Sequence, residues 1–176
     1  MIGIFVYVGA EVAIGSFLIN YFTQANIGNI SESAASRYLS AYWFCAMVGR
    51  FLGSAILRKV RTSTVLAVAA ISACLLVCVS MLSSGHLAMG SIILVGLFNS
   101  VMFPSIFTLG IAELGPLTGD GSGFLIMAIV VGAAVPLAVG LLADRIGLQR
   151  ALLLPALCYL YIVYYAWKGS QPSVSA

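Results

Sequence analysis

One carboxylate lies in the middle of the first apolar run of the chain. Glu11 is flanked by Ala10 and Val12, and no Lys or Arg lies within a helical turn of it. A charge at the bilayer centre costs at least about 2.5–3.5 kcal/mol on insertion scales, so such residues usually face a bundle interior or a wet path. Tyr7, one helical turn earlier, shares this face and can donate to the carboxylate or to a bound hydroxyl. We predict a polar binding site here; the alternative is a neutral glutamic acid hydrogen-bonded between helices.

A second polar side chain, Asn99, lies in the middle of another apolar run. Its amide brings two donors and an acceptor, which suits a ligand with neighbouring hydroxyl groups. Phe103 follows one turn later and can stack on an apolar ligand face, and Pro104 predicts a kink beside the site because it lacks a backbone donor. Trp43 is expected either to stack on a ligand or to occupy the interfacial belt. For Asn99 the alternative is an interhelical hydrogen bond.

Charged residues near the ends of the apolar runs are candidates for gating. Arg50 lies near the end of the second run, where it either snorkels to the interface or pairs with Glu113 or Asp120. Asp144 and Arg145 lie together near the end of the fifth run, at the opposite end of the bundle, where they can cap helix ends. A charge pair that breaks as helices move would suit a gate.

The remaining reactive residues show no catalytic or metal-ligand arrangement. The four cysteines lie inside apolar runs, and the pair one turn apart, Cys74 and Cys78, has no His or carboxylate beside it, so we interpret all four as packing residues. Ser122 and His86 invite comparison with intramembrane serine proteases. They are expected on opposite sides of the bilayer, whereas a general base must lie within hydrogen-bond reach of its nucleophile. We therefore predict that the chain is not an enzyme and holds no metal or cofactor.

Helices in a membrane must position these residues, because the chain is too apolar for a water-soluble domain. Of its 176 residues, 62% are hydrophobic and 7% are charged, whereas soluble domains are roughly 45–50% apolar and about 25% charged. The net charge of +3 comes without a basic, aromatic-rich run, so nucleic acid is not an expected partner. A spanning helix needs about 20 apolar residues. Six runs meet this need: 2–22, 38–57, 63–81, 87–112, 124–143 and 151–167.

The fold class predicted is therefore an all-α membrane protein of six transmembrane helices, with a bundle over residues 1–168 and a tail over 169–176. An even number of spans puts both termini on one side, and the excess of Lys and Arg near the span ends places that side in the cytoplasm. The cations on that side are Arg50, Arg58, Lys59, Arg61 and Lys168, against Arg37, Arg145 and Arg150 on the other.

A weak internal repeat divides the bundle into two triplets of helices. Residues 53–58 align with residues 140–145, and each stretch closes the second helix of a triplet, the first over about 1–82 and the second over about 87–168. Because three spans is an odd number, the triplets insert with opposite orientations, as in many secondary transporters. Small residues also recur every fourth position and predict close helix packing. They are Ala41, Cys45, Gly49 and Gly53 in one stripe, and Ala128, Gly132, Pro136 and Gly140 in the other.

The second of these aligned stretches resembles a known loop motif. Residues 140–147 are similar to the motif of the major facilitator superfamily in which a glycine precedes an Asp–Arg pair, and residues 53–61 resemble a degraded copy of it. The stretches 7–16, 38–51 and 98–107 resemble a narrower branch, the bacterial fucose, glucose and galactose proton symporters. Together with the last span they cover most of the chain, and they match helices seven to twelve, the C-terminal half of a twelve-helix family.

The resemblance implies half of a secondary active transporter that moves a monosaccharide with protons across the bacterial inner membrane. Sugar contacts then fall to the candidate binding residues and alternating access to the charged residues. In this order they are Tyr7, Glu11, Asn99, Phe103 and Trp43, and Arg50, Glu113, Asp144 and Arg145.

The family's carboxylates associated with proton coupling lie largely in the other half, and the chain begins directly inside a span. We therefore interpret it as a fragment or a split-gene product that needs an amino-terminal six-helix partner. The alternative is a homodimer, because the two halves of this superfamily are related by an axis along the membrane normal.

Overall fold

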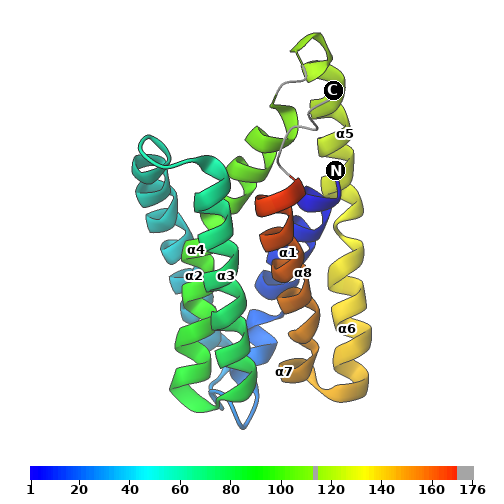
Figure 1. Cartoon of the computed structure of the whole chain (residues 1–176). Helices are drawn as coiled ribbons and strands as arrows, with labels where there is room; N and C mark the ends of the chain where they lie inside the picture. The colour runs from blue at the N-terminus through cyan, green and yellow to red at the C-terminus, as the bar shows by residue number, and fades with distance from the viewer. Residues whose placement is uncertain (113–114, 170–176) are drawn as a thin grey trace.

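The computed structural model describes residues 1–112 and 115–169, and their regular elements are all helical (Figure 1). Six segments are long and apolar enough to cross a membrane, which confirms the predicted fold class. The chain is thus a multi-pass membrane protein. The segments are Ile2–Thr23, Glu32–Leu57, Thr62–Leu82, Gly85–Ile111, Gly115–Ile146 and Leu148–Lys168.

Four of the spans are single helices and two are composite. The single helices are α1 (Ile2–Thr23), α2 (Glu32–Leu57), α3 (Thr62–Leu82) and α4 (Gly85–Ile111). The fifth span joins the short turn η1 (Gly115–Leu117) to α5 (Thr118–Val131) and α6 (Ala134–Ile146). The sixth joins α7 (Leu148–Ala151), α8 (Leu153–Tyr164) and the short π-helix η2 (Tyr165–Gly169).

Helix α2 starts before the predicted residue 38, because its first turns are polar and are stabilised by an N-cap, whereas the prediction followed the apolar run. The Ser31 hydroxyl accepts a hydrogen bond from the backbone N–H of Ala34 at 3.4 Å, as a helix N-cap does. Glu32 follows in the first turn, where a negative charge is favoured by the helix dipole. The first turns of α2 therefore project beyond the apolar run that the hydropathy pattern marks.

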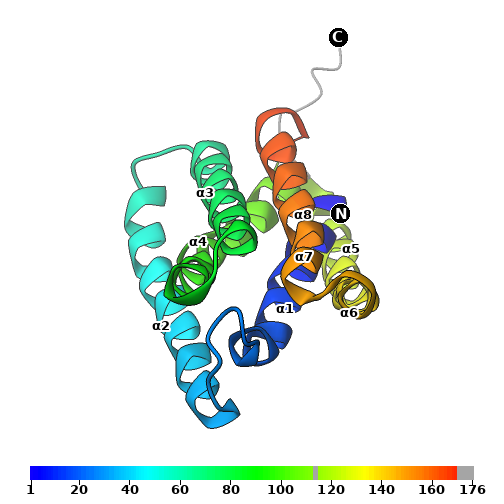
Figure 2. The same cartoon turned by 90° about the horizontal axis from the view of Figure 1, so that it is seen from below.

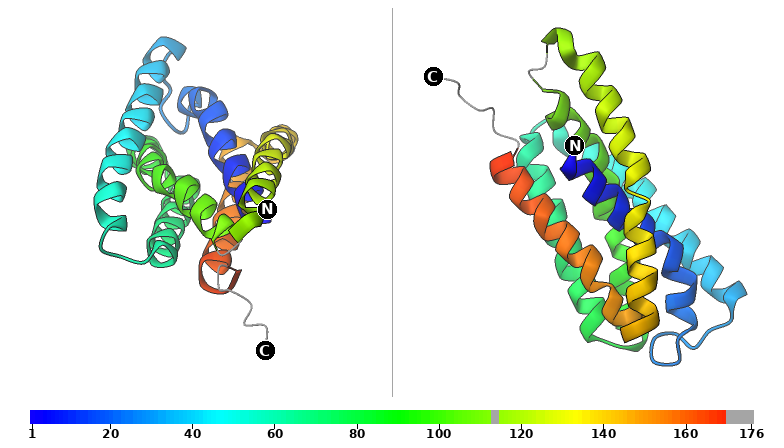
Figure 3. Two further views of the ribbon diagram at one scale, coloured as in Figure 1. Left: turned by 90° about the horizontal axis from the view of Figure 1, so that it is seen from above. Right: turned by 90° about the vertical axis from the view of Figure 1, so that its right-hand side faces the viewer.

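The fifth span breaks at Gly132 and Ala133, between α5 and α6. Pro136 lies four residues after Gly132, where its ring lacks a donor and crowds that carbonyl. The break packs closely against α1, since a Cβ atom on Gly132 would lie 3.2 Å from the carbonyl oxygen of Phe5. Figure 3 shows α1 beside the yellow part of this span. The predicted packing stripe thus serves the contact between α1 and the broken helix.

The connections alternate between the two ends of the bundle. The α2–α3 connection lies at the same end as the N-terminus and η2, and the α1–α2, α3–α4 and α6–α7 connections lie at the other end (Figure 1). The aligned stretches 53–58 and 140–145 accordingly close α2 and α6 at opposite ends, as inverted triplets require. The end of the predicted tail, residues 170–176, lies outside the described residues.

Glycines allow α2 and α4 to cross at backbone contact. A Cβ atom on Gly49 would overlap the carbonyl oxygen of Leu97, and one on Gly96 would lie 2.6 Å from the carbonyl oxygen of Tyr42. Small residues at such crossings let helix axes approach, which is how helices associate in lipid. The crossing holds the middle of α4 against the middle of α2, and so places Asn99 beside Tyr42.

Replacing Gly49 with Ala is expected to destabilise the bundle, because the added methyl group has no space between α2 and α4. Overpacking typically costs about 1–3 kcal/mol, so the temperature at which detergent-solubilised protein unfolds should fall. Gly90→Ala, also in a membrane helix, is the matched control because nothing lies within 4 Å of its added Cβ atom. Equal unfolding temperatures for the two variants would contradict the close crossing.

Candidate functional site

A buried amide joins four helices at the centre of the bundle. Asn99 of α4 is fully buried. Its Oδ1 accepts a hydrogen bond from the hydroxyl of Tyr159 in α8 at 2.8 Å, and its Nδ2 donates to the hydroxyl of Tyr42 in α2 at 3.1 Å. Tyr7 of α1 donates its hydroxyl to the backbone carbonyl of Asn99 at 2.8 Å. We refer to Asn99 and these three tyrosines as the Asn99 hub.

The polar groups of the hub form hydrogen bonds with one another, as they must because they are buried away from water. All three tyrosines are at most 1% exposed. A buried polar group without a partner costs about 1–3 kcal/mol, and hydrocarbon offers no water to replace a lost partner. Every buried side-chain nitrogen and oxygen among the described residues has a hydrogen-bond partner. The hub therefore fixes how α1, α2, α4 and α8 are rotated about their own axes.

Two hollows open beside the hub, and Glu11 and Arg50 line both of them. Their volumes are about 530 Å³ and about 500 Å³. We call them the Glu11 hollows. The larger is lined by Tyr7, Glu11, Arg50, Ser54, Leu57, Ser100, Val101, Phe103 and Pro104. The smaller is lined by Glu11, Val12, Gly15, Ser16, Trp43 and Arg50.

Side chains of opposite charge line both hollows. The carboxyl group of Glu11 is attracted electrostatically to the guanidinium of Arg50, which comes from α2. Tyr7 borders the larger hollow too, but its one hydroxyl proton is donated to the backbone carbonyl of Asn99. Arg50 is exposed and Glu11 is partly exposed, so both can contact water or a polar ligand in the hollows. The pair supplies an acceptor and several donors to whatever occupies this space.

The structure brings four of the five predicted binding residues to the hollows. Besides Glu11, these are Tyr7 from α1, Trp43 from α2 and Phe103 from α4. Trp43 is 48% exposed and meets Tyr42 edge-on, with ring centroids 5.3 Å apart at 83°. Phe103 is 37% exposed, so two aromatic surfaces border the charged pair.

Asn99 lies elsewhere than predicted, one layer behind the hollows. The oxygen and the nitrogen of its side-chain amide each form a hydrogen bond with a tyrosine hydroxyl, and Asn99 lines neither hollow. The interhelical hydrogen bond, set out above as the alternative to ligand contact, is what the structure shows for this side chain. Its backbone carbonyl oxygen also accepts a hydrogen bond, from the hydroxyl of Tyr7. Asn99 therefore positions Tyr7 and Tyr42 rather than contacting a ligand in this geometry.

The predicted gating residues are not brought together in one place. Arg50 interacts with Glu11 in the hollows. Glu113 lies outside the described residues, and Asp120 lies in the first turn of α5. Asp144 and Arg145 are exposed near the C-terminal end of α6, at the opposite end of the bundle. A gating role for these residues stays a prediction.

Tyr42 and Tyr159 are the residues of this site that sequence reasoning missed. They reach Asn99 across separations of 57 and 60 residues. Helical spacing relates residues only within one helix, so it could pair Tyr7 with Glu11 but not Asn99 with its partners. The one available signal was a tyrosine in the middle of an apolar run, where its hydroxyl needs a buried partner.

Inverted helix triplets of this kind are an architecture found in many secondary transporters. Known proteins specify it further. The chain is 48% identical over 170 residues to a protein of Brucella abortus named glucose/galactose transporter, covering 97% of the chain and 41% of the relative. It is 44% identical over 173 residues to a putative glucose/galactose transporter of Helicobacter pylori, with coverages of 96% and 42%. It is 35% identical over 172 residues to the L-fucose-proton symporter of Escherichia coli, with coverages of 97% and 39%.

Solved structures agree with these relatives. A crystal structure of the major facilitator superfamily transporter FucP in the outward conformation superposes with a TM-score of 0.90 and 35% identity, covering 94% of this chain and 40% of that chain. No protein-family model matches the chain. These matches confirm the predicted resemblance to the major facilitator superfamily and its sugar symporters, and the chain spans about 40% of the length of the relatives it matches.

Replacing Asn99 with Leu is expected to destabilise the bundle, because the hydroxyls of Tyr42 and Tyr159 both lose their partner. Leaving a buried polar group unpaired costs about 1–3 kcal/mol, so the unfolding temperature in detergent should fall. Ser91→Ala is the matched control: Ser91 is also buried in α4, but its hydroxyl bonds only the nearby carbonyl of Ala88. If both variants unfold at the wild-type temperature, the hub does not hold these helices together.

Proposed function

We propose that the chain is one half of a secondary transporter that moves a monosaccharide of the glucose, galactose or fucose type together with protons. One observation carries the proposal: this chain, which is similar to named sugar transporters, has the carboxyl group of Glu11 beside open hollows in the middle of a span. The names of the relatives suggest the class of substrate, and the hollows suggest where it binds. No enzymatic reaction is part of this function.

The lining of the hollows suits a sugar. In the proposed complex the Glu11 carboxylate accepts hydrogen bonds from two neighbouring hydroxyls, and the Arg50 guanidinium donates to a third oxygen. Trp43 and Phe103 offer aromatic faces to the apolar C–H face of a pyranose, a common arrangement of apolar walls with few polar groups. Tyr7, held by the Asn99 hub, borders the same space.

A second half is proposed to cover this flank. Charged residues at mid-membrane face a bundle interior or a wet cavity rather than lipid, yet Arg50 is exposed in this chain. Large apolar side chains of α2 surround it. They are exposed to the extent of 48% for Trp43, 60% for Phe44, 47% for Met47 and 73% for Phe51. An amino-terminal six-helix bundle, or else a second copy of this chain, would bury this surface and enclose the sugar.

Transport then follows by rocking of one bundle against the other. Proton binding at a carboxylate would bias this movement, and the family resemblance assigns the coupling carboxylates largely to the other half. Glu11 is therefore proposed to bind the sugar, while the hub keeps its own helices moving as one body. Asp144 and Arg145 are proposed to act in gating at the far end. The proposal places the chain in a bacterial inner membrane with residues 58–61 in the cytoplasm, following the excess of cations there.

Transport is tested by replacing the matching 170-residue segment of the Brucella transporter with this chain. Vesicles carrying the chimera should take up labelled glucose, galactose or fucose in response to an inward proton gradient, and a protonophore should abolish accumulation. Vesicles carrying the unmodified chain report in parallel whether it transports alone as two copies. A folded chimera without uptake of any of the three sugars would contradict the proposed function.

Glu11→Gln in this chimera tests the proposed sugar contact. Loss of charge-assisted hydrogen bonds of about 1.5–3 kcal/mol should weaken sugar binding by roughly 10- to 100-fold, seen as a higher KM. Glu32→Gln is the matched control, because Glu32 is an exposed residue in the first turn of α2. If Glu11→Gln transports with the same KM as Glu32→Gln, the hollows are not the sugar site even though the protein transports.

A further inference from the structure

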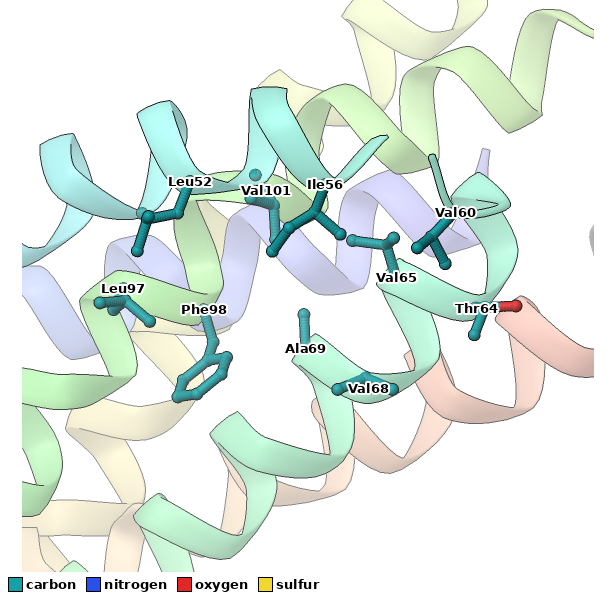
Figure 4. A pocket seen from close by; sticks show the side chains of 12 residues that line it. Leu52, Ile56, Val60, Thr64, Val65, Val68, Ala69, Leu97, Phe98 and Val101 are labelled. Carbon is teal, nitrogen blue, oxygen red and sulfur yellow. The ribbon is translucent and has the colours of Figure 1, made fainter. Parts of the chain in front are cut away.

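A third hollow, which is apolar, lies on a different part of the bundle. Helices α2 and α3 barely touch each other, although both pack along α4, so they diverge over it (Figure 2). The resulting groove has a volume of about 220 Å³, and α4 forms its floor (Figure 4). We call it the α2–α3 groove. Among the residues that line it are Gly49, Leu52 and Ile56 of α2, Val68 of α3 and Val101 of α4.

The groove lies at membrane level and is open at its side. From Gly49 to Ile56 it follows α2 for about 10 Å, which is most of one leaflet of a roughly 30 Å hydrocarbon layer. The rim is exposed, with Leu52 at 52%, Ile56 at 47% and Val68 at 57%. Its lining side chains are apolar apart from Thr64. An occupant of this space is therefore a hydrocarbon chain or another apolar surface.

Three cations stand at the mouth of the groove. Val60 and Thr64 mark its end at the α2–α3 connection, and that connection carries Arg58, Lys59 and Arg61. All three are exposed, and within the described part of the chain no carboxylate pairs with them. The first turn of α3 contains no acidic residue either. The mouth of an apolar groove thus carries an uncompensated positive charge.

We infer that the α2–α3 groove and these three cations form one binding site for an anionic glycerophospholipid. One acyl chain occupies the groove, and the phosphate of the headgroup lies against Arg58, Lys59 and Arg61. Basic residues near a membrane surface attract anionic lipid with about 1 kcal/mol each. A second copy fits less well, because a symmetric contact would set these cations against their own copies.

The site is separate from the proposed sugar site. The groove uses Leu52 and Ile56 of α2, whereas the Glu11 hollows use Arg50 and Ser54 on another face of the same helix. A partner half that covers the hollows would leave the groove open to lipid. The inference does not rest on the transport proposal, and a failure of one leaves the other standing.

Native mass spectrometry of the detergent-purified chain tests the inference. The probes are phosphatidylglycerol and phosphatidylcholine with identical acyl chains, and phosphatidylglycerol should bind at least about 10-fold more tightly. Lys59→Ala combined with Arg61→Ala should weaken phosphatidylglycerol by about fivefold for each lost charge. The control is Arg37→Ala with Arg150→Ala, which removes two exposed cations at the other end of the bundle and should leave binding unchanged.

Filling the groove tests the acyl-chain part of the site. Val68→Trp should abolish selective binding, whereas Leu75→Trp, two turns along the same face of α3 and 61% exposed, should not. Equal affinity for the two lipids, or equal effects of the test and control variants, would show only unspecific annular lipid and overturn the inference. A dimer that Val68→Trp dissociates would also overturn it, because the occupant would then be a second copy.

Discussion

A polar side chain buried between helices in hydrocarbon must find its hydrogen bonds within the protein. In this chain that constraint converges on the amide of Asn99, which bonds the hydroxyls of Tyr42 and Tyr159 while its own carbonyl accepts from Tyr7. Rotating any of the four helices by a fraction of a turn would leave a phenol or the amide unpaired. The hub therefore fixes the rotational register of α1, α2, α4 and α8 within the bundle.

The features of the candidate site follow from that register. Tyr7 sets the face of α1, so Glu11 one turn later points into the hollows rather than into lipid. Tyr42 sets the face of α2, which puts Trp43 and Arg50 beside the same space. The glycine crossing of α2 with α4 allows the tyrosine to reach its partner. Packing, hydrogen bonding and the placement of charge thus depend on one another at the centre of the molecule.

The spans could be predicted from the sequence because hydrocarbon thickness leaves a strong apolar signal, and helical spacing places Tyr7 and Glu11 on one face of α1. The early start of α2 was missed because its first turns, from Glu32, are polar and lie outside the apolar run. The break at Gly132 was predicted only as packing. An interhelical hydrogen bond was one of two alternatives for Asn99, but its partners could not be predicted, since they come from three other helices and no local spacing relates them. Arg50 was assigned to an end of the bundle, because its interaction with Glu11 likewise depends on how α1 and α2 are rotated.

Water access at position 11 is the most direct test of whether the hub holds this carboxylate beside a wet path. The four native cysteines, which lie in the spans, would first be replaced by Ser or Ala, and Glu11→Cys would then be compared with Leu75→Cys on the exposed surface of α3. A charged, membrane-impermeant thiol reagent should label position 11 but not position 75, and Asn99→Leu should alter the rate at position 11. No labelling at position 11, or equal labelling at both positions, would contradict the account.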